Sequence, residues 1–129
     1  MAQQIEARGH LLYADEPLEG GGGDIGPSPY ELLLSALGAC TAMTLRLYAG
    51  RHGWPLEGVE IVLRHERVYL EDCRDCESPG SRLERVTKRL ALHGPLDEAQ
   101  RQRLAEIAER CPVNRTLHSN VQIEQELLP

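Results

Sequence analysis

The sequence predicts an α+β protein, and three features of the chain lead to this fold class. Short stretches with the alternating apolar pattern of strands occur near both ends, and two more form a pair in the middle. Two other stretches open with helix-start signals and continue with apolar residues at helical spacing. The expected order is strand, helix, two strands, helix, strand. Because this order lacks the regular alternation that builds a parallel sheet, we expect an α+β arrangement.

Length and composition predict one domain with an aliphatic core. The 129 residues are enough for a single core, and the chain shows no internal repeat or linker, so we expect one domain over residues 1–129. Hydrophobic residues make up 41% of the chain, but phenylalanine is absent. We therefore expect leucine, valine and alanine to fill the core.

Charge and segment lengths exclude several classes of partner and location. A net charge of −6 and an isoelectric point near 5.3 disfavour binding to nucleic acid or to an anionic membrane surface. Met1–His10 carries no apolar run behind a cationic start, so no signal peptide is expected. The longest apolar or small stretch, Leu32–Leu45, is shorter than the roughly 20 residues that a membrane span needs. We expect a cytoplasmic protein whose four cysteines are reduced thiols.

The first part of the chain predicts a strand region and a loop. Ile5–Ala14 has strand character with a possible turn at Arg8 and Gly9. Asp15–Ser28 contains the glycine run Gly20–Gly23. No lysine follows these glycines, which disfavours a phosphate-binding loop. A flexible or tightly turning connection is the expected structure.

The first helix has a well-defined start. Ser28 can cap it, Pro29 suits the first helical position, and Glu31 completes a capping box three residues after the cap. Glycines at Gly50 and Gly53 permit its end.

The body of this helix, LLLSALGACTAMTL, is apolar or small on every face, which predicts burial all round. One face carries very small residues that would let another helix approach closely: Ser35, Gly38, Ala39 and Ala42. Cys40 lies on a different face, with Ala36, Leu37, Met43 and Leu47.

The middle of the chain predicts a long hairpin. Val59–Leu70 is rich in β-branched and apolar residues, and Leu83–His93 alternates as a return strand. The polar segment Glu71–Ser81 between them contains a proline-glycine turn signal.

The last third predicts a second helix and a final strand. Asp97 and Gln100 form another possible capping box, which opens an amphipathic helix that reaches Cys111 and stops at Pro112. After a short turn, Val121–Leu128 is expected to form the last strand.

The chemistry of the chain centres on two helix cysteines. Cys40 and Cys111 are expected on the inward faces of the two predicted helices, so both sulfur atoms could enter one core. Two-cysteine peroxidases need this arrangement, because one thiolate attacks the peroxide and a second thiol condenses with the resulting sulfenic acid. A buried cysteine is also an ordinary small hydrophobic residue, and spacing leaves both interpretations open.

Two motifs resemble a known family. The run GPSPYELLLSALGACTAMTLRLYA over Gly26–Ala49, with ERCPVNRTL over Glu109–Leu117, resembles the OsmC/Ohr family of organic hydroperoxide reductases and osmotically induced proteins. The match is closer to a less characterised branch, and it extends from about His10 to Ile123. The resemblance implies an intertwined homodimer in which two buried helices pack against antiparallel sheet.

The resemblance also implies a function. It implies a thiol-dependent peroxidase of oxidative-stress defence that reduces organic hydroperoxides or hydrogen peroxide, is recycled by a dithiol reductant and needs no cofactor or metal. Cys40 would be the attacking thiol and Cys111 the resolving thiol.

Glu31 is a third catalytic candidate, and its position differs from the pattern of the family. The family's peroxidases place a glutamate directly after the helix-start proline, whereas here Tyr30 follows the proline and the acid is one residue later. Nine helical residues separate Glu31 from Cys40 by about 13 Å, so only a partner subunit could bring the two together. The family also uses an arginine from an N-terminal segment, for which Arg8 is the nearest candidate.

Two alternatives remain open. The first is a non-catalytic dimer that binds an apolar small molecule in the pocket between the helices, with its cysteines only packing. The second is a metal-dependent module built on Cys73 and Cys76, whose C-x-x-C spacing supplies half of a zinc site. His65 and His93 are expected to lie too far down the strands to complete that site, so no bound metal is expected.

Overall fold

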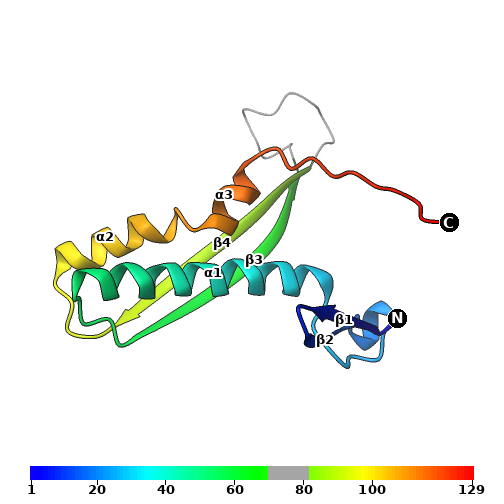
Figure 1. Ribbon diagram of the computed structural model, residues 1–129, viewed down its shortest axis with the longest axis horizontal. Helices are drawn as coiled ribbons and strands as arrows, with labels where there is room; N and C mark the ends of the chain where they lie inside the picture. The colour runs from blue at the N-terminus through cyan, green and yellow to red at the C-terminus, as the bar shows by residue number, and fades with distance from the viewer. Residues whose placement is uncertain (70–81) are drawn as a thin grey trace. The chain divides into compact units, whose positions relative to one another are not determined.

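The computed structural model describes residues 1–69 and 82–129 and has the α+β architecture that the sequence predicts (Figure 1). Two two-stranded sheets form, one from β1 and β2 and one from β3 and β4. The elements, in chain order, are β1 (Gln3–Ala7), β2 (His10–Ala14), the short 3₁₀ helix η1 (Leu18–Gly20), α1 (Pro29–His52), β3 (Gly58–Tyr69), β4 (Arg82–His93), α2 (Glu98–Ala108) and α3 (Pro112–His118). Leu70 and Glu71–Ser81, which the sequence assigns to a strand end and a turn, lie outside the described residues.

The chain divides into two compact units. The first contains Met1–Ala36 and the described part of Val62–Arg89, and the second contains Leu37–Ile61 and Leu90–Pro129. Both α1 and the β3–β4 hairpin contribute to each unit. A single domain over residues 1–129 therefore stays a prediction.

In the first unit, the predicted N-terminal strand is a tight antiparallel hairpin. The register pairs Gln3 with Ala14 and Ala7 with His10. Arg8 and Gly9 form the turn with φ angles of 51° and 82°. Two successive positive φ angles are the signature of the two-residue turn whose twist matches that of paired strands.

The glycine-rich loop of the first unit is built around a buried carboxylate. Asp15 is only 3% exposed. It accepts hydrogen bonds from the backbone N–H groups of Glu16 at 2.8 Å, Gly23 at 3.0 Å and Ile25 at 3.4 Å. A Cβ at Gly22 would overlap the carbonyl oxygen of Glu16. Glycine is therefore required for the close turn, which fits the tightly turning form of the expected connection.

Helix α1 begins and ends where the sequence predicts. The Ser28 N–H donates to Glu31 Oε1 at 3.1 Å, and the Glu31 N–H donates to Ser28 Oγ at 3.3 Å, so the capping box is formed. Gly53, with a φ of 66°, follows the last helical residue.

The expectation that α1 is buried on every face is wrong for the single chain. Its buried residues form one stripe with a spacing of four: Leu37, Thr41, Leu45 and Ala49. Met43 is 70% and Leu47 is 56% exposed. The face of very small residues is not the buried one either, because the longer side chains of the stripe fill the core instead.

Helix α1 is also longer than its apolar stretch. The helix has 24 residues and contains an 18-residue apolar window with a mean hydropathy of 1.4. Of that window, 22% is buried. By length and composition it could cross a membrane, a criterion that the core helix of a water-soluble protein also meets.

The hydrophobic core described for the second unit lies between α1, α2 and the adjoining strand ends. Figure 1 shows α2 beside the C-terminal part of α1. The core residues are Leu45, Ala49, Leu56, Leu96, Leu104, Ile107 and Ala108, with Tyr48, Trp54, Val59, Leu90 and Leu92 packed against them. The predicted capping box of α2 is formed, since the Gln100 N–H donates to Asp97 Oδ1 at 2.7 Å and the Asp97 N–H donates to Gln100 Oε1 at 3.0 Å.

Two predictions for the last third of the chain are wrong. Helix α2 ends at Ala108 rather than at Cys111, and a separate helix, α3, replaces the predicted short turn. The predicted strand over Val121–Leu128 is not formed, and these residues are exposed without regular structure. A strand needs a neighbouring edge to accept and donate its backbone hydrogen bonds, and nothing in the described chain pairs with this segment.

Candidate active site

The two predicted reactive cysteines lie in the second unit, in different local structures. Cys40 is half-buried on α1, next to the buried stripe of that helix. Cys111 is fully buried, and it is the N-cap residue of α3 rather than a residue on the apolar face of α2. Its extended backbone and the following Pro112, at the first position of α3, fix this helix start. Both cysteines are thiols rather than members of a disulfide.

The first turn of α3 donates hydrogen bonds to both sulfur atoms. The Val113 N–H donates to Cys40 Sγ at 3.5 Å. The next residue, Asn114, donates its N–H to Cys111 Sγ at 3.3 Å. The first N–H groups of a helix have no partner within the helix, and here the two sulfur atoms accept them. Two thiols 71 positions apart in the sequence therefore share one turn of backbone donors.

A buried hydroxyl group, which sequence reasoning missed, completes this arrangement. Thr41 is fully buried, and its Oγ1 lies 3.5 Å from Cys111 Sγ. The same hydroxyl donates to the carbonyl oxygen of Leu37 at 2.8 Å. The available signal was its position, since Thr41 is the polar member of a stripe that repeats every four residues.

The start of α3 is also tied to the end of α2. The side-chain amide of Asn114 donates to the carbonyl oxygen of Glu109 at 3.0 Å. This bond fixes the direction in which the chain leaves α2 and enters α3. The position of Cys111 therefore depends on the connection between the two helices as well as on the helix start.

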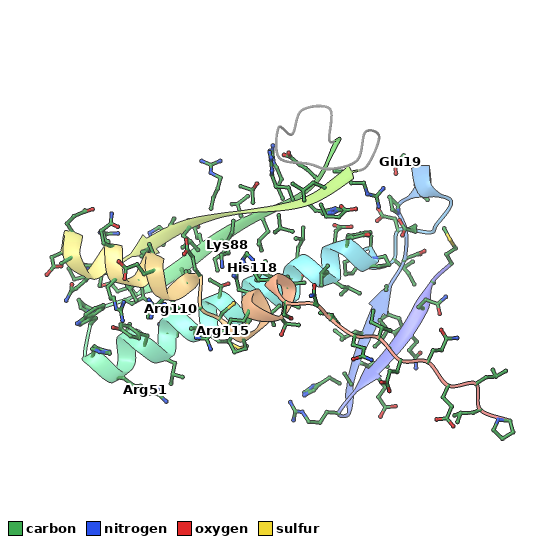
Figure 2. All side chains as sticks on the ribbon, turned by 90° about the horizontal axis from the view of Figure 1, so that it is seen from above. Glu19, Arg51, Lys88, Arg110, Arg115 and His118 are labelled. Atoms are coloured by element: carbon green, nitrogen blue, oxygen red, sulfur yellow. The ribbon has the colours of Figure 1, made fainter. Side chains whose placement is uncertain are left out.

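Basic side chains flank the buried Cys111 thiol in the sequence. Figure 2 shows Arg110 beside the connection from α2, and Arg115 and His118 on α3. All three side chains are exposed. The donor described for Cys40 Sγ within residues 1–69 and 82–129 is a backbone N–H group.

Glu31, the third predicted site residue, lies in the first unit and acts there as a helix cap. Besides its capping-box bonds, its carbonyl oxygen accepts a hydrogen bond from Ser35 Oγ at 2.7 Å. Hydrogen bonding to Ser28 holds the pKa of the Glu31 carboxyl below its ordinary value, with the larger effect from the Ser28 backbone N–H and the smaller from its hydroxyl. The described contacts account for its place in the helix, and a catalytic role stays a prediction.

The first unit also holds a polar cluster beside the helix start, which sequence reasoning did not find. The Tyr30 ring stacks on His65 with centroids 4.5 Å apart, and the Arg67 guanidinium lies 5.7 Å from the Tyr30 centroid. Glu84 accepts from His65 Nε2 at 2.6 Å and pairs with Arg67 Nε at 3.4 Å. The pKa of Arg67 is raised above its ordinary value. The larger cause is hydrogen bonding to Tyr30, and the next is the negative charge of Glu84. By contrast, Arg8 is exposed in the β1–β2 turn.

The metal-site candidates Cys73 and Cys76 lie outside the described residues. Among residues 1–69 and 82–129, no three histidine, cysteine or acidic side chains are grouped so that they could hold a metal ion. A pocket of about 220 Å³ in the first unit is lined by Met1, Gln3, Ala14, Asp15, Glu16 and Pro29, none of which is a predicted site residue.

Comparison with known proteins gives a family and several related folds. The sequence model of the family described as OsmC-like protein matches residues 20–126. No protein with a curated description matches the chain.

Three solved structures illustrate the related folds. An OsmC-like protein from Mycoplasma pneumoniae is 20% identical with a TM-score of 0.71, and the match covers 91% of this chain and 79% of that one. The organic hydroperoxide resistance protein OhrB of Bacillus subtilis is 21% identical with a TM-score of 0.60, covering 93% and 90%. An organic hydroperoxide resistance protein OsmC from Legionella pneumophila is 20% identical with a TM-score of 0.61, covering 93% and 89%. The TM-scores show a common fold, and at such low identities the likeness shows the fold alone.

Proposed function

The chain belongs to the family of OsmC-like proteins, and we propose that it reduces organic hydroperoxides or hydrogen peroxide with the thiols of Cys40 and Cys111. The observation that carries the proposal is the shared turn of α3, in which consecutive N–H groups bind the two sulfur atoms. The shared turn supports a mechanism in which the second thiol reacts with the first after oxidation. The named neighbours that are hydroperoxide resistance proteins support the same chemistry.

In the proposed reaction, Cys40 as thiolate attacks one peroxide oxygen. A sulfur–oxygen bond forms, the oxygen–oxygen bond breaks, and the alkoxide leaves as an alcohol after taking up a proton. Cys40 is then a sulfenic acid. Cys111 attacks its sulfur, the sulfur–oxygen bond breaks, and water leaves as the disulfide forms. A dithiol reductant returns both cysteines to thiols by exchange.

The burial of the two thiols supports this division of roles. Cys40 is half-buried, whereas Cys111 is fully buried, so a peroxide arriving from solvent meets Cys40 first. The N–H of Val113 can donate a charge-assisted hydrogen bond to the sulfur anion. Cys111 is the N-cap residue of α3, and its sulfur accepts from the N–H group directly after the one that donates to Cys40 Sγ.

The proposal includes a homodimer in the cytoplasm. In the second unit, Met43 and Leu47 lie one turn apart on α1 and are 70% and 56% exposed in the single chain. Neighbouring exposed apolar side chains of this size are typical of a subunit interface. The partner subunit is also the route by which Glu31 could act on a thiol.

The test is peroxide consumption with a dithiol reductant, together with mass spectrometry of the oxidised protein. Wild type should consume alkyl hydroperoxide and form a Cys40–Cys111 disulfide within one chain. Cys40→Ser should lose turnover. Cys111→Ser should keep the first oxidation, and its Cys40 should proceed to sulfinic acid under excess peroxide because no thiol resolves the intermediate.

The matched control is the double variant Cys73→Ser with Cys76→Ser, which removes two other thiols and should keep turnover. Loss of turnover in this folded variant would show that the wrong pair has been assigned. If Cys40 of wild type stays reduced with stoichiometric alkyl hydroperoxide, the thiols only pack, and binding of an apolar small molecule becomes the better explanation.

A further inference from the structure

Thr41 is a buried polar side chain at the thiol pair. It is fully buried, and so is Cys111, whose sulfur lies 3.5 Å from Thr41 Oγ1. The Thr41 hydroxyl also bonds the Leu37 carbonyl at 2.8 Å, and the bond to Leu37 fixes the position of its oxygen. One hydroxyl group thus has two possible recipients for its proton.

The number of protons available determines how this hydroxyl can act. A hydroxyl has one proton and two lone pairs. While Thr41 donates to Leu37, its oxygen can only accept from Cys111, so the neutral thiol is the donor in that contact. A Cys111 thiolate has no proton to donate, and it would instead need the hydroxyl proton. Rotation about the Cβ–Oγ1 bond supplies that proton without moving a heavy atom.

This rotation leaves the Leu37 carbonyl with a partner. Leu37 and Thr41 are four residues apart within α1, so the Thr41 backbone N–H is the helical donor to the same carbonyl oxygen. The hydroxyl can therefore change its recipient without leaving a buried acceptor unpaired.

We propose that Thr41 is a positioning residue for the second step of the reaction, in which its hydroxyl turns from Leu37 to the Cys111 sulfur as that thiol loses its proton. The inference rests on the proposed function. The Cys111 proton leaves with the sulfenic hydroxyl of Cys40 as water, the new bond joins the two sulfur atoms, and Thr41 ends the step with its own proton. The Asn114 N–H and the Thr41 hydroxyl then both donate to the attacking sulfur.

The experiment measures the two steps separately in a single turnover. The protein is mixed with alkyl hydroperoxide, quenched at intervals and analysed by mass spectrometry for Cys40 sulfenic acid and for the Cys40–Cys111 disulfide. Thr41→Val keeps the side-chain shape and removes the hydroxyl. It should slow disulfide formation roughly 10- to 100-fold, the effect expected for a lost hydrogen bond to a charged group, and sulfenic acid should accumulate.

Three controls separate this role from a packing defect. Thr41→Ser retains the hydroxyl and should resolve faster than Thr41→Ala, and since both variants lose the same methyl group, their difference reports the hydroxyl alone. Thr44→Val makes the same chemical change three residues further along α1 and should resolve at the wild-type rate. In a Cys111→Ser background, Thr41→Val should not change the lifetime of the sulfenic acid, because the step that it assists is already absent.

Disulfide formation at the wild-type rate in Thr41→Val would overturn the inference and leave the proposed function standing. Equal resolution rates in Thr41→Ser and Thr41→Ala would also overturn it. Failure of wild type to oxidise Cys40 at all would overturn the proposed function and this inference together.

Discussion

At the scale of single residues, the buried carboxylate of Asp15 connects loop structure with stability. Its carboxylate is almost fully buried and organises the glycine-rich loop that leads into α1. The Glu16 N–H is the largest cause that lowers the pKa of Asp15 below its ordinary value of 3.8, and the N–H groups of Gly23 and Ile25 add to it. The folded protein therefore favours the ionised carboxyl.

Stability should depend on pH through this residue. Because the pKa of Asp15 is lower in the folded state, its contribution is present above the unfolded value of 3.8 and is lost as the pH falls through the folded value. Asp15→Asn should lower the melting temperature at pH 7, and its difference from wild type should shrink towards pH 2. Thermal unfolding at several pH values measures both effects.

Asp24→Asn is the matched control for Asp15→Asn. Asp24 is exposed in the same loop and has a φ of 53°, which asparagine also tolerates, so its replacement should change the melting temperature little. An Asp15→Asn deficit that is the same at pH 7 and pH 2 would contradict the role assigned to the charge.

Among the elements, the connection from β4 to α2 depends on one glycine. Gly94 has a φ of 130°, and a Cβ there would overlap the carbonyl oxygen of Pro55. The adjoining backbone is fixed, because the Glu57 N–H donates to the His93 carbonyl at 2.8 Å. Gly94→Ala should therefore destabilise the protein by more than about 1 kcal/mol.

Gly50→Ala is the matched substitution with the opposite expected sign. Gly50 lies in the last turns of α1, and a Cβ there meets nothing within 4 Å. Alanine should stabilise this helix position by up to about 1 kcal/mol relative to glycine. Chemical denaturation of both variants tests the pair, and a Gly94→Ala protein as stable as wild type would contradict the packing described for this connection.

For the whole molecule, the apolar surface of α1 predicts a homodimer. Met43 and Leu47 are 70% and 56% exposed on the single chain. Wild type should sediment at twice the mass of one chain at low micromolar concentration. Met43→Glu should shift the protein towards monomer, because burying an unpaired carboxylate in an apolar interface is costly.

Leu18→Glu is the control for the dimer test, since Leu18 is 71% exposed on η1 rather than on α1, and its replacement should leave the dimer intact. A wild-type chain that sediments as a stable monomer would contradict the interface. The segment Val121–Leu128, which the sequence predicts as a strand, pairs with no described strand of its own chain.

The sequence by itself determined the element types from β1 to α2, whereas it missed α3 and predicted a last strand that is not formed. The starts of α1 and α2 follow from capping pairs three residues apart, Ser28 with Glu31 and Asp97 with Gln100, and each pair forms its two hydrogen bonds. Interactions of this range are encoded by neighbouring residues and need no tertiary contact. The polar cluster beside the start of α1 could not be predicted in this way, because its side chains come from α1, β3 and β4. No pattern of neighbouring residues in the sequence indicates the contacts among Tyr30, His65, Arg67 and Glu84.

Only the tertiary structure decided how the thiol pair is held. The sequence named Cys40 and Cys111, but it placed Cys111 on a helix face, whereas the chain starts a new helix there and uses its sulfur as the cap. The contact of Thr41 with Cys111 joins residues 70 positions apart. Such a contact depends on which stripe of α1 is buried and on where α2 ends, and both are set by side-chain packing across the core rather than by any local signal.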